Sequence, residues 1–193
     1  MFKRLLVLLL TLCLFLSASA LADNAIALPR THVYEDIFSI NYPDDWRVHQ
    51  IGMESTATDK ECGLLYSPED TGLNMEIFVF YVDSMADANV TQMSSDELTA
   101  YALETIELEK ALQFSFADFV VTHSAPSIIF LVCNGADEQG QLFIAETVLD
   151  GWITRIYGYA YTDGTYTACR DLTSEDYALF KAIVESYTPL NLE

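Results

Sequence analysis

Residues 141–161 read QLFIAETVLDGWITRIYGYAY, two strand-like stretches separated by the pair Asp150-Gly151. Both stretches are rich in β-branched, aliphatic and aromatic side chains, and Asp-Gly pairs favour the tight turn between antiparallel strands. We therefore expect strands over residues 141–150 and 152–161. Further strands are expected just upstream, at 116–124 and 127–133, and the four together predict an antiparallel meander.

The last strand of this meander has different side chains on its two faces. Alternation along the strand sends three tyrosines to one face of the sheet and smaller or aliphatic side chains to the other: Tyr157, Tyr159 and Tyr161 against Ile156, Gly158 and Ala160. The face with the small residues would let a helix or loop approach the sheet closely.

The chain upstream of the meander also begins with strands. Residues 38–42, FSINY, alternate apolar and polar side chains and run into the turn PDDW, in which Trp46 is expected to close one end of the core. Turn residues in PEDTG, 68–72, predict a hairpin between the strands on either side. The remaining expected elements are strands at 47–53, 63–67 and 73–83 and a polar loop at 54–61.

Two helices are expected. Ser94 and Glu97 form a capping box that predicts a helix running to about Leu112. Its buried stripe is Leu98, Tyr101, Ala102, Thr105 and Ile106. The second helix begins at 173–176 and is ended by Thr188-Pro189; its apolar stripe is Phe180, Ile183, Val184 and Tyr187.

These elements predict an α+β fold in which a mostly antiparallel sheet is sandwiched by helices. No internal repeat and no long linker divides the chain, so residues 31–193 are expected to form a single domain. Residues 23–30 are expected to form a short N-terminal arm.

The N-terminal segment predicts export. Residues 1–22 contain a positively charged N-terminal region, then an apolar run and then small residues, which is the order of a cleaved secretory signal peptide. Ala20-Leu21-Ala22 predicts cleavage before Asp23, with Ala18-Ser19-Ala20 as the second choice. No second long apolar run follows, so we expect a secreted protein, periplasmic or extracellular, without a membrane span after cleavage.

Charge excludes one class of partner. The chain has 9 Lys and Arg against 29 Asp and Glu, a net charge of −20, so it lacks the basic footprint that nucleic-acid binding needs. Such an acidic surface suits a hydrated secreted protein and attracts divalent cations.

Three cysteines remain after cleavage: Cys62, Cys133 and Cys169. An oxidising compartment permits one disulfide among them with one thiol left over, or none. Their spacing matches no zinc-binding pattern.

The order of these motifs resembles the Mog1/PsbP-like α/β/α sandwich family. The resemblance lies in FSINYPDDW at 38–46, SSDEL at 94–98, the strands of 127–161 and FKAIVESY at 180–187. It implies a PsbP-like or Mog1-like fold that docks onto protein complexes without chemistry of its own. It implies no catalytic residue and no cofactor.

Three sets of residues could carry a function. The tyrosines Tyr157, Tyr159 and Tyr161, joined by Phe143 of the neighbouring strand, could form a binding surface for a partner, or could instead lie in the core under a helix. Acidic pairs in turns could bind Ca²⁺, although none has the EF-hand loop pattern: Asp44-Asp45, Glu69-Asp70 and Asp137-Glu138. Cys133 and His123 could act as a thiol and its base.

The leading hypothesis is therefore a secreted, non-enzymatic binding or assembly module that acts on an envelope or extracellular protein of unknown identity. The alternative is a secreted hydrolase-like or cation-dependent protein that uses the acidic loops and His123.

Overall fold

The computed structural model describes residues 26–34, 37–49, 59–90, 92–110, 115–122, 128–134, 141–163 and 169–190. Its strands are β1 Arg30–Tyr34, β2 Phe38–Tyr42, β3 Arg47–His49, β4 Asp59–Tyr66, β5 Leu73–Tyr81, β6 Ser115–Thr122, β7 Ile128–Asn134, β8 Gln141–Leu149, β9 Trp152–Ala160 and β10 Thr188–Pro189. Its helices are the short η1, Asp83–Met85, and the longer α2, Ser95–Lys110, and α3, Ser174–Glu185.

The main layer is a seven-stranded sheet in the order β3-β4-β5-β9-β8-β7-β6. All of its pairs are antiparallel. It consists of two meanders, β3 to β5 and β6 to β9, joined where β5 pairs with β9. The predicted meander is confirmed, and the α+β class with it.

The β8–β9 hairpin has the tight turn that its sequence predicts. Asp150 and Gly151 both have positive φ, 50° and 84°, the backbone of the two-residue turns that match the twist of paired strands. This turn sets the register, because Leu149 pairs with Trp152 and each earlier residue of β8 then faces a fixed partner in β9.

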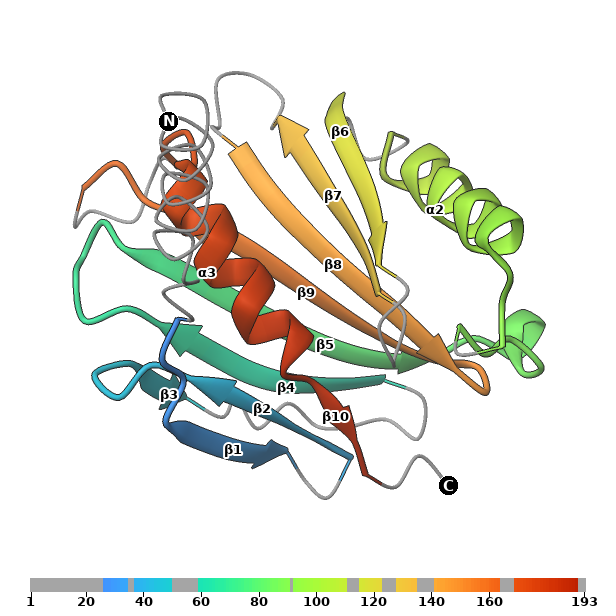
Figure 1. Cartoon of the computed structure of the whole chain (residues 1–193), viewed down its shortest axis with the longest axis horizontal. Coiled ribbons are helices and arrows are strands. Elements are labelled where there is room, and N and C mark those ends of the chain that lie inside the picture. The colour runs from blue at the N-terminus through green and yellow to red at the C-terminus, as the bar shows by residue number, and fades with distance from the viewer. Residues whose placement is uncertain are drawn as a thin grey trace, which may run out of the picture.

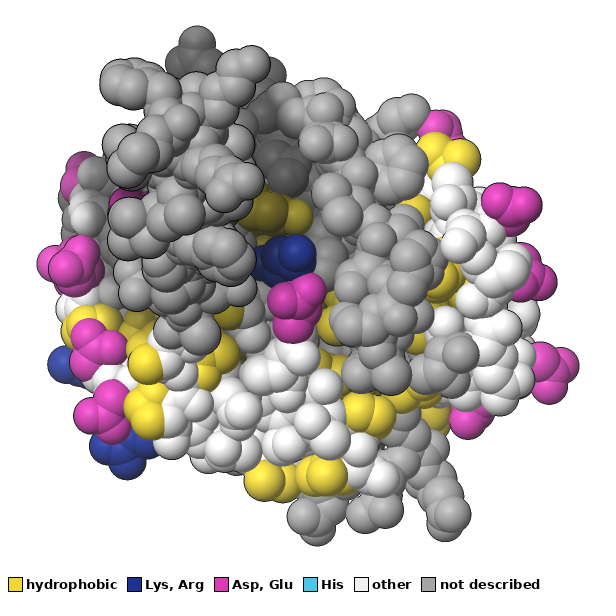
Figure 2. Space-filling model, viewed as in Figure 1, with side chains coloured by type: hydrophobic (Ala, Val, Ile, Leu, Met, Phe, Trp, Pro, Cys, Tyr) yellow, Lys and Arg dark blue, Asp and Glu magenta, His cyan; other side chains and the backbone are white. Residues whose placement is uncertain are grey.

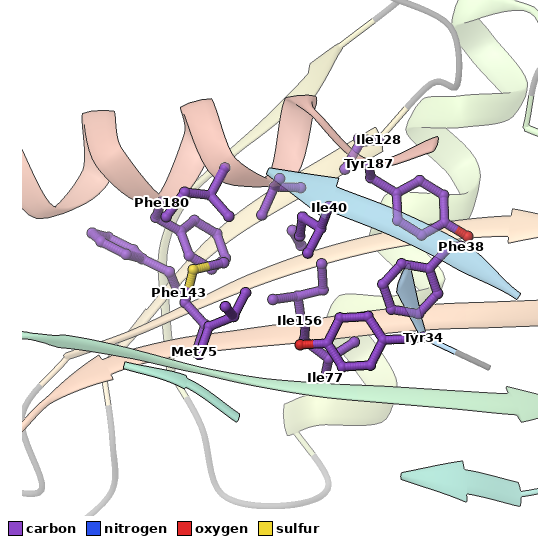
Figure 3. Close-up of a cluster of buried hydrophobic side chains, with 14 of the residues drawn as sticks. Tyr34, Phe38, Ile40, Met75, Ile77, Ile128, Phe143, Ile156, Phe180 and Tyr187 are labelled. Atoms are coloured by element: carbon purple, nitrogen blue, oxygen red, sulfur yellow. The ribbon is translucent and has the colours of Figure 1, made fainter. Parts of the chain in front are cut away.

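One face of the large sheet is covered by α3 and by a second, three-stranded sheet, β1-β2-β10 (Figure 1). Figure 3 shows the core between them, where aromatic rings of β1, β2 and α3 meet aliphatic side chains of β5 and β9. All four residues of the predicted stripe, Phe180, Ile183, Val184 and Tyr187, are buried there. The close approach is also confirmed, because Phe180 lies against Gly158.

The opposite face is packed by α2. Leu98 and Ala102 of the helix are buried against Val148 and Ile153 of the sheet in a second apolar cluster. The capping box is present, since the Ser94 amide donates to Glu97 (2.8 Å) and the Glu97 amide donates to the Ser94 hydroxyl (3.4 Å). Helices thus sandwich the sheet, as expected.

Helix α3 is held at its start by a cap and an ion pair. The Asp176 carboxylate accepts from the Thr173 amide (2.7 Å), and the Thr173 hydroxyl accepts from the Asp176 amide (3.1 Å). Arg170 binds the same carboxylate (2.8 Å) and also donates to the carbonyl of Thr71 (3.1 Å). The turn between β4 and β5 is thereby tied to the helix.

Some expectations need correction. Strands β1 and β10 were not expected, and Arg30, expected in the arm, begins β1. Residues 59–61, expected in a polar loop, extend β4, because they pair with residues 78–80 of β5. The rest of the expected strand 47–53 beyond His49, and residues 111–112 of the first helix, lie outside the described residues.

Candidate functional site

A cleft of about 590 Å³ lies between α2 and the large sheet. We call it the α2 cleft. Its volume is in the range typical of ligand-binding sites. Its floor comes from β5, β8 and β9, one wall from α2 and the other wall from the segment that contains η1. The lining residues are Phe80, Val82, Ser84, Met85, Asp87, Ala88, Tyr101, Glu104, Thr105, Glu146, Ile153 and Arg155.

The η1 wall is fixed to the β8–β9 turn by backbone hydrogen bonds. The amide of Val82 donates to the carbonyl of Gly151 (3.0 Å), and the amide of Asp150 donates to the carbonyl of Ala88 (2.8 Å). The amide of Val90 donates to the carbonyl of Val148 (3.0 Å). The tight turn between β8 and β9 therefore positions this wall of the cleft.

A buried ion pair lies at the floor of the cleft. Glu146 is 2% exposed, and its carboxylate accepts hydrogen bonds from Arg155 Nε, from the Tyr101 hydroxyl and from the Thr105 hydroxyl (3.2 Å). Glu146 and Arg155 are directly opposed in the β8–β9 register, and the two hydroxyls come from the buried face of α2. The pair therefore joins the helix to the sheet.

Arg155 also contacts the aromatic side chains around it. Its guanidinium carbon lies 5.6 Å from the centre of the Phe80 ring, a cation–π contact, and its Nη1 donates to the Tyr157 hydroxyl (3.5 Å). Burial alone would lower the pKa of Arg155, but the charge of Glu146, the influence of Tyr157 and the hydrogen bonds to both residues together outweigh burial and raise that pKa. Burial, together with Glu146, raises the pKa of Tyr101. Both groups therefore act as hydrogen-bond donors at neutral pH.

The mouth of the cleft is polar and acidic. Ser84 and Asp87 on the η1 wall and Glu104 on α2 are all exposed, whereas Tyr101 and Thr105 deeper in the cleft are buried. A group that enters would pass carboxylates and then reach an apolar and aromatic interior. The arrangement is suited to binding, because the one buried carboxylate is already held by three donors.

The three candidate tyrosines lie on the sheet face that α2 packs against, and each is half-buried. Tyr157 makes an edge contact with Phe78 (ring centres 5.8 Å apart), and Tyr159 makes one with Tyr161 (5.4 Å). Burial, with smaller contributions from Tyr161 and Glu76, raises the pKa of Tyr159. Tyr157 connects this row to the cleft through Arg155.

Phe143 does not join the tyrosines, which corrects the expected four-residue surface. It pairs with Gly158 in the β8–β9 register, so its side chain points to the other face of the sheet than Tyr157 and Tyr159. There it is 3% exposed and packs on Tyr177 and Phe180 of α3. Phe143 is a core residue.

The described acidic pairs do not converge. Asp44 and Asp45 are exposed, and Asp44 forms an ion pair with Arg30 (2.5 Å). Within the described residues, no three His, Cys, Asp or Glu side chains are grouped to hold a metal ion. Asp137, Glu138 and the proposed base His123 lie outside the described residues.

Among the cysteines, Cys169 is an unpaired thiol, half-buried, and burial raises its pKa. Cys62 lies in β4 and Cys133 in β7, and the order of the sheet places β5, β9 and β8 between those strands. Neighbouring strands are about 4.8 Å apart, so the two backbones are well beyond the roughly 7 Å that a disulfide spans.

Of the helices in the described ranges, none combines the length and the apolar character needed to cross a membrane.

The α2 cleft is not among the predicted features, although the sequence holds two signals for its floor. Tyr101 and Thr105 carry hydroxyls on an otherwise apolar helix stripe, and Glu146 is a lone carboxylate inside an apolar strand. A buried polar group requires a partner, so these residues together indicate a buried polar contact between helix and sheet.

Comparison with known proteins shows the fold. No protein-family model matches the chain, and no curated protein matches its sequence. A solved structure that it resembles is the solution structure of cyanobacterial PsbP (CyanoP) from Synechocystis sp. PCC 6803. The TM-score is 0.53 at 13% sequence identity, and the match covers 87% of this chain and 96% of that one. The chain therefore has a PsbP-like fold, as its motifs predicted.

Proposed function

We propose that this chain is a secreted, non-enzymatic binding module that acts on an envelope or extracellular protein, and that the α2 cleft is where the partner docks. The observation that carries the proposal is the cleft itself, about 590 Å³ in volume, with an apolar and aromatic interior around a buried ion pair. Export is proposed from the order of residues in the segment 1–22.

The interior of the cleft supports binding over catalysis. General acid–base or nucleophilic catalysis needs a reactive group with a partner that activates it. Glu146 is enclosed by its three donors, and the Ser84 hydroxyl lies at the exposed mouth. Apolar area with a few fixed polar groups is instead the composition of a recognition site.

The PsbP-like fold agrees with this function but does not select a partner, because one fold serves many functions. The tyrosine row next to the cleft adds aromatic area for contact. We propose that Tyr157, Tyr159 and Tyr161 extend the docking surface beyond the α2 cleft along β9.

Site-specific photocrosslinking tests the proposal in the native host. A benzophenone amino acid at Ser84, on the mouth of the cleft, should give one crosslinked product of defined mass. The same group at Ala178, which is exposed on α3 on the opposite face of the sheet, is the matched control and should give none. Ala88→Trp, which fills the cleft from its wall, should abolish the Ser84 product while the thermal unfolding curve stays cooperative.

Two results would overturn the proposal. One is a partner that crosslinks from Ala178 as strongly as from Ser84. The other is a Ser84 product that survives Ala88→Trp in a folded protein.

A further inference from the structure

We propose that the α2 cleft receives a cationic side chain, a lysine or an arginine, from the partner protein. This inference rests on the proposed function and specifies the chemistry of the group that enters the cleft.

The residues that line the α2 cleft carry a net negative charge. The lining contains the carboxylates of Asp87, Glu104 and Glu146 and a single guanidinium, that of Arg155. Glu146 and Arg155 are in direct contact and neutralise each other. The carboxylates of Asp87 and Glu104 are left at the mouth, one on each wall, so the entrance carries net negative charge.

The interior of the cleft is largely apolar and aromatic. The lining also includes Val82, Met85 and Ile153, an apolar surface that suits the methylene stem of lysine or arginine. Phe80 already faces one cation, the guanidinium of Arg155 at 5.6 Å from its centre, so aromatic rings form part of the environment for positive charge.

The chain as a whole is strongly acidic. The net charge is −20, and Figure 2 shows acidic side chains around the described surface of one face with far fewer basic ones. Such a field attracts basic protein surfaces and repels acidic ones during encounter. An anionic ligand at Arg155 would have to pass Asp87 and Glu104, so the cleft discriminates against carboxylates and phosphates.

Binding of short peptides to the full chain tests the inference. The probes are the blocked tripeptides Gly-Lys-Gly, Gly-Arg-Gly and Gly-norleucine-Gly, followed by backbone amide shifts in NMR spectra. The lysine and arginine peptides should shift the amides of Ser84, Asp87 and Glu104 and leave those of α3 unchanged. The norleucine peptide, which keeps the stem and lacks the charge, should bind more weakly.

Paired substitutions separate the local charge from the net charge. Asp87→Asn with Glu104→Gln should weaken binding of the lysine peptide by about two- to thirtyfold, the range for losing two exposed charge pairs. Asp45→Asn with Glu69→Gln changes the net charge equally at exposed positions that do not line the cleft, and should have a much smaller effect. Raising the salt concentration should reduce the difference in lysine-peptide affinity between the wild type and the Asp87→Asn, Glu104→Gln protein.

The outcomes distinguish this inference from the proposed function. If the Ser84 crosslink persists unchanged in the Asp87→Asn, Glu104→Gln protein but is abolished by Ala88→Trp, the partner docks in the cleft without a cationic group and the inference is wrong. If a small amine is found bound stoichiometrically to the native protein and no protein crosslinks, then the cationic group does not come from a partner protein and the inference is wrong. Equal effects of the two paired substitutions would also overturn it.

Discussion

The ring of Phe180 packs directly against the backbone of Gly158. A Cβ atom at Gly158 would lie 2.6 Å from Cδ2 and 2.7 Å from Cε2 of that ring, closer than side-chain atoms can pack. Glycine at this position therefore sets how closely α3 approaches the centre of the sheet, while its neighbours Tyr157 and Tyr159 point to the other side.

Gly158→Ala should lower the free energy of unfolding by roughly 1–3 kcal/mol, because the added methyl group overpacks a fully buried contact. Urea denaturation of the wild type and the variant measures this loss. In a Phe180→Leu background the same substitution should cost clearly less, since the ring that it meets is gone. Equal costs in both backgrounds would show that the contact is not the cause.

Removing one member of the Glu146–Arg155 pair should destabilise the protein by about 3–5 kcal/mol. Arg155→Leu would leave a carboxylate that is 2% exposed without its counter-charge. The double variant Glu146→Leu, Arg155→Leu should be less damaged than the sum of the two single variants, because no uncompensated charge remains buried. Additive losses in urea denaturation would contradict a coupled pair.

Asp176→Asn should cost about 1–2 kcal/mol at pH 7, because it weakens both the cap of α3 and the ion pair with Arg170. Burial alone would raise the pKa of Asp176, but hydrogen bonds from Arg170 and Thr173 outweigh it, so that pKa lies below its ordinary value of 3.8. The stabilisation is therefore fully present above the unfolded pKa and is lost as the pH falls through the lowered folded pKa.

Unfolding curves of wild type and Asp176→Asn should accordingly be well separated at pH 7 and converge as the pH falls below about 4. Glu175→Gln, at the exposed neighbouring position, is the control and should leave the pH dependence of stability nearly unchanged. If the unfolding curves of wild type and Asp176→Asn stay equally far apart down to low pH, the pH-dependent stabilisation does not come from the Asp176 carboxylate.

The exported protein should begin at Asp23. Intact-mass measurement on protein from the extracytoplasmic fraction of the native host checks this directly. Ala22→Arg places a large charged residue at the cleavage site and should move cleavage to the bond before Leu21 or prevent it. A mature protein that retains residues 1–22 would contradict the predicted cleavage.

Elements with strong local signals could be predicted from the sequence. The α3 stripe, the Ser94 capping box and the Asp150-Gly151 turn all depend on residues within a few positions of one another. Strand β10 could not be predicted, because it has two residues, one of them Pro189, and exists only through its pairing with β2. Strand β1 likewise has exposed residues at most of its positions and no clear alternation.

In the candidate site, too, some features could be predicted from local sequence and others could not. The tyrosine face followed from alternation within β9, whereas the place of Phe143 required the register between β8 and β9. That register also opposes Glu146 to Arg155, and it follows from a two-residue turn at Asp150-Gly151 once that turn is recognised. The α2 cleft itself depends on how α2 and the η1 segment sit on the sheet, which local patterns do not encode.

The pairing of β10 with β2 also determines when the molecule can finish folding. Thr188 pairs with Ser39 and Pro189 with Phe38, so the smaller sheet joins residues near both ends of the chain. The core beneath it likewise needs Phe180, Ile183 and Tyr187 from the last part of the sequence. Contacts of such long sequence separation slow folding, because loop closure comes before the stabilising contacts. The main core therefore cannot be completed until the segment that contains α3 and β10 is available to pack against β2.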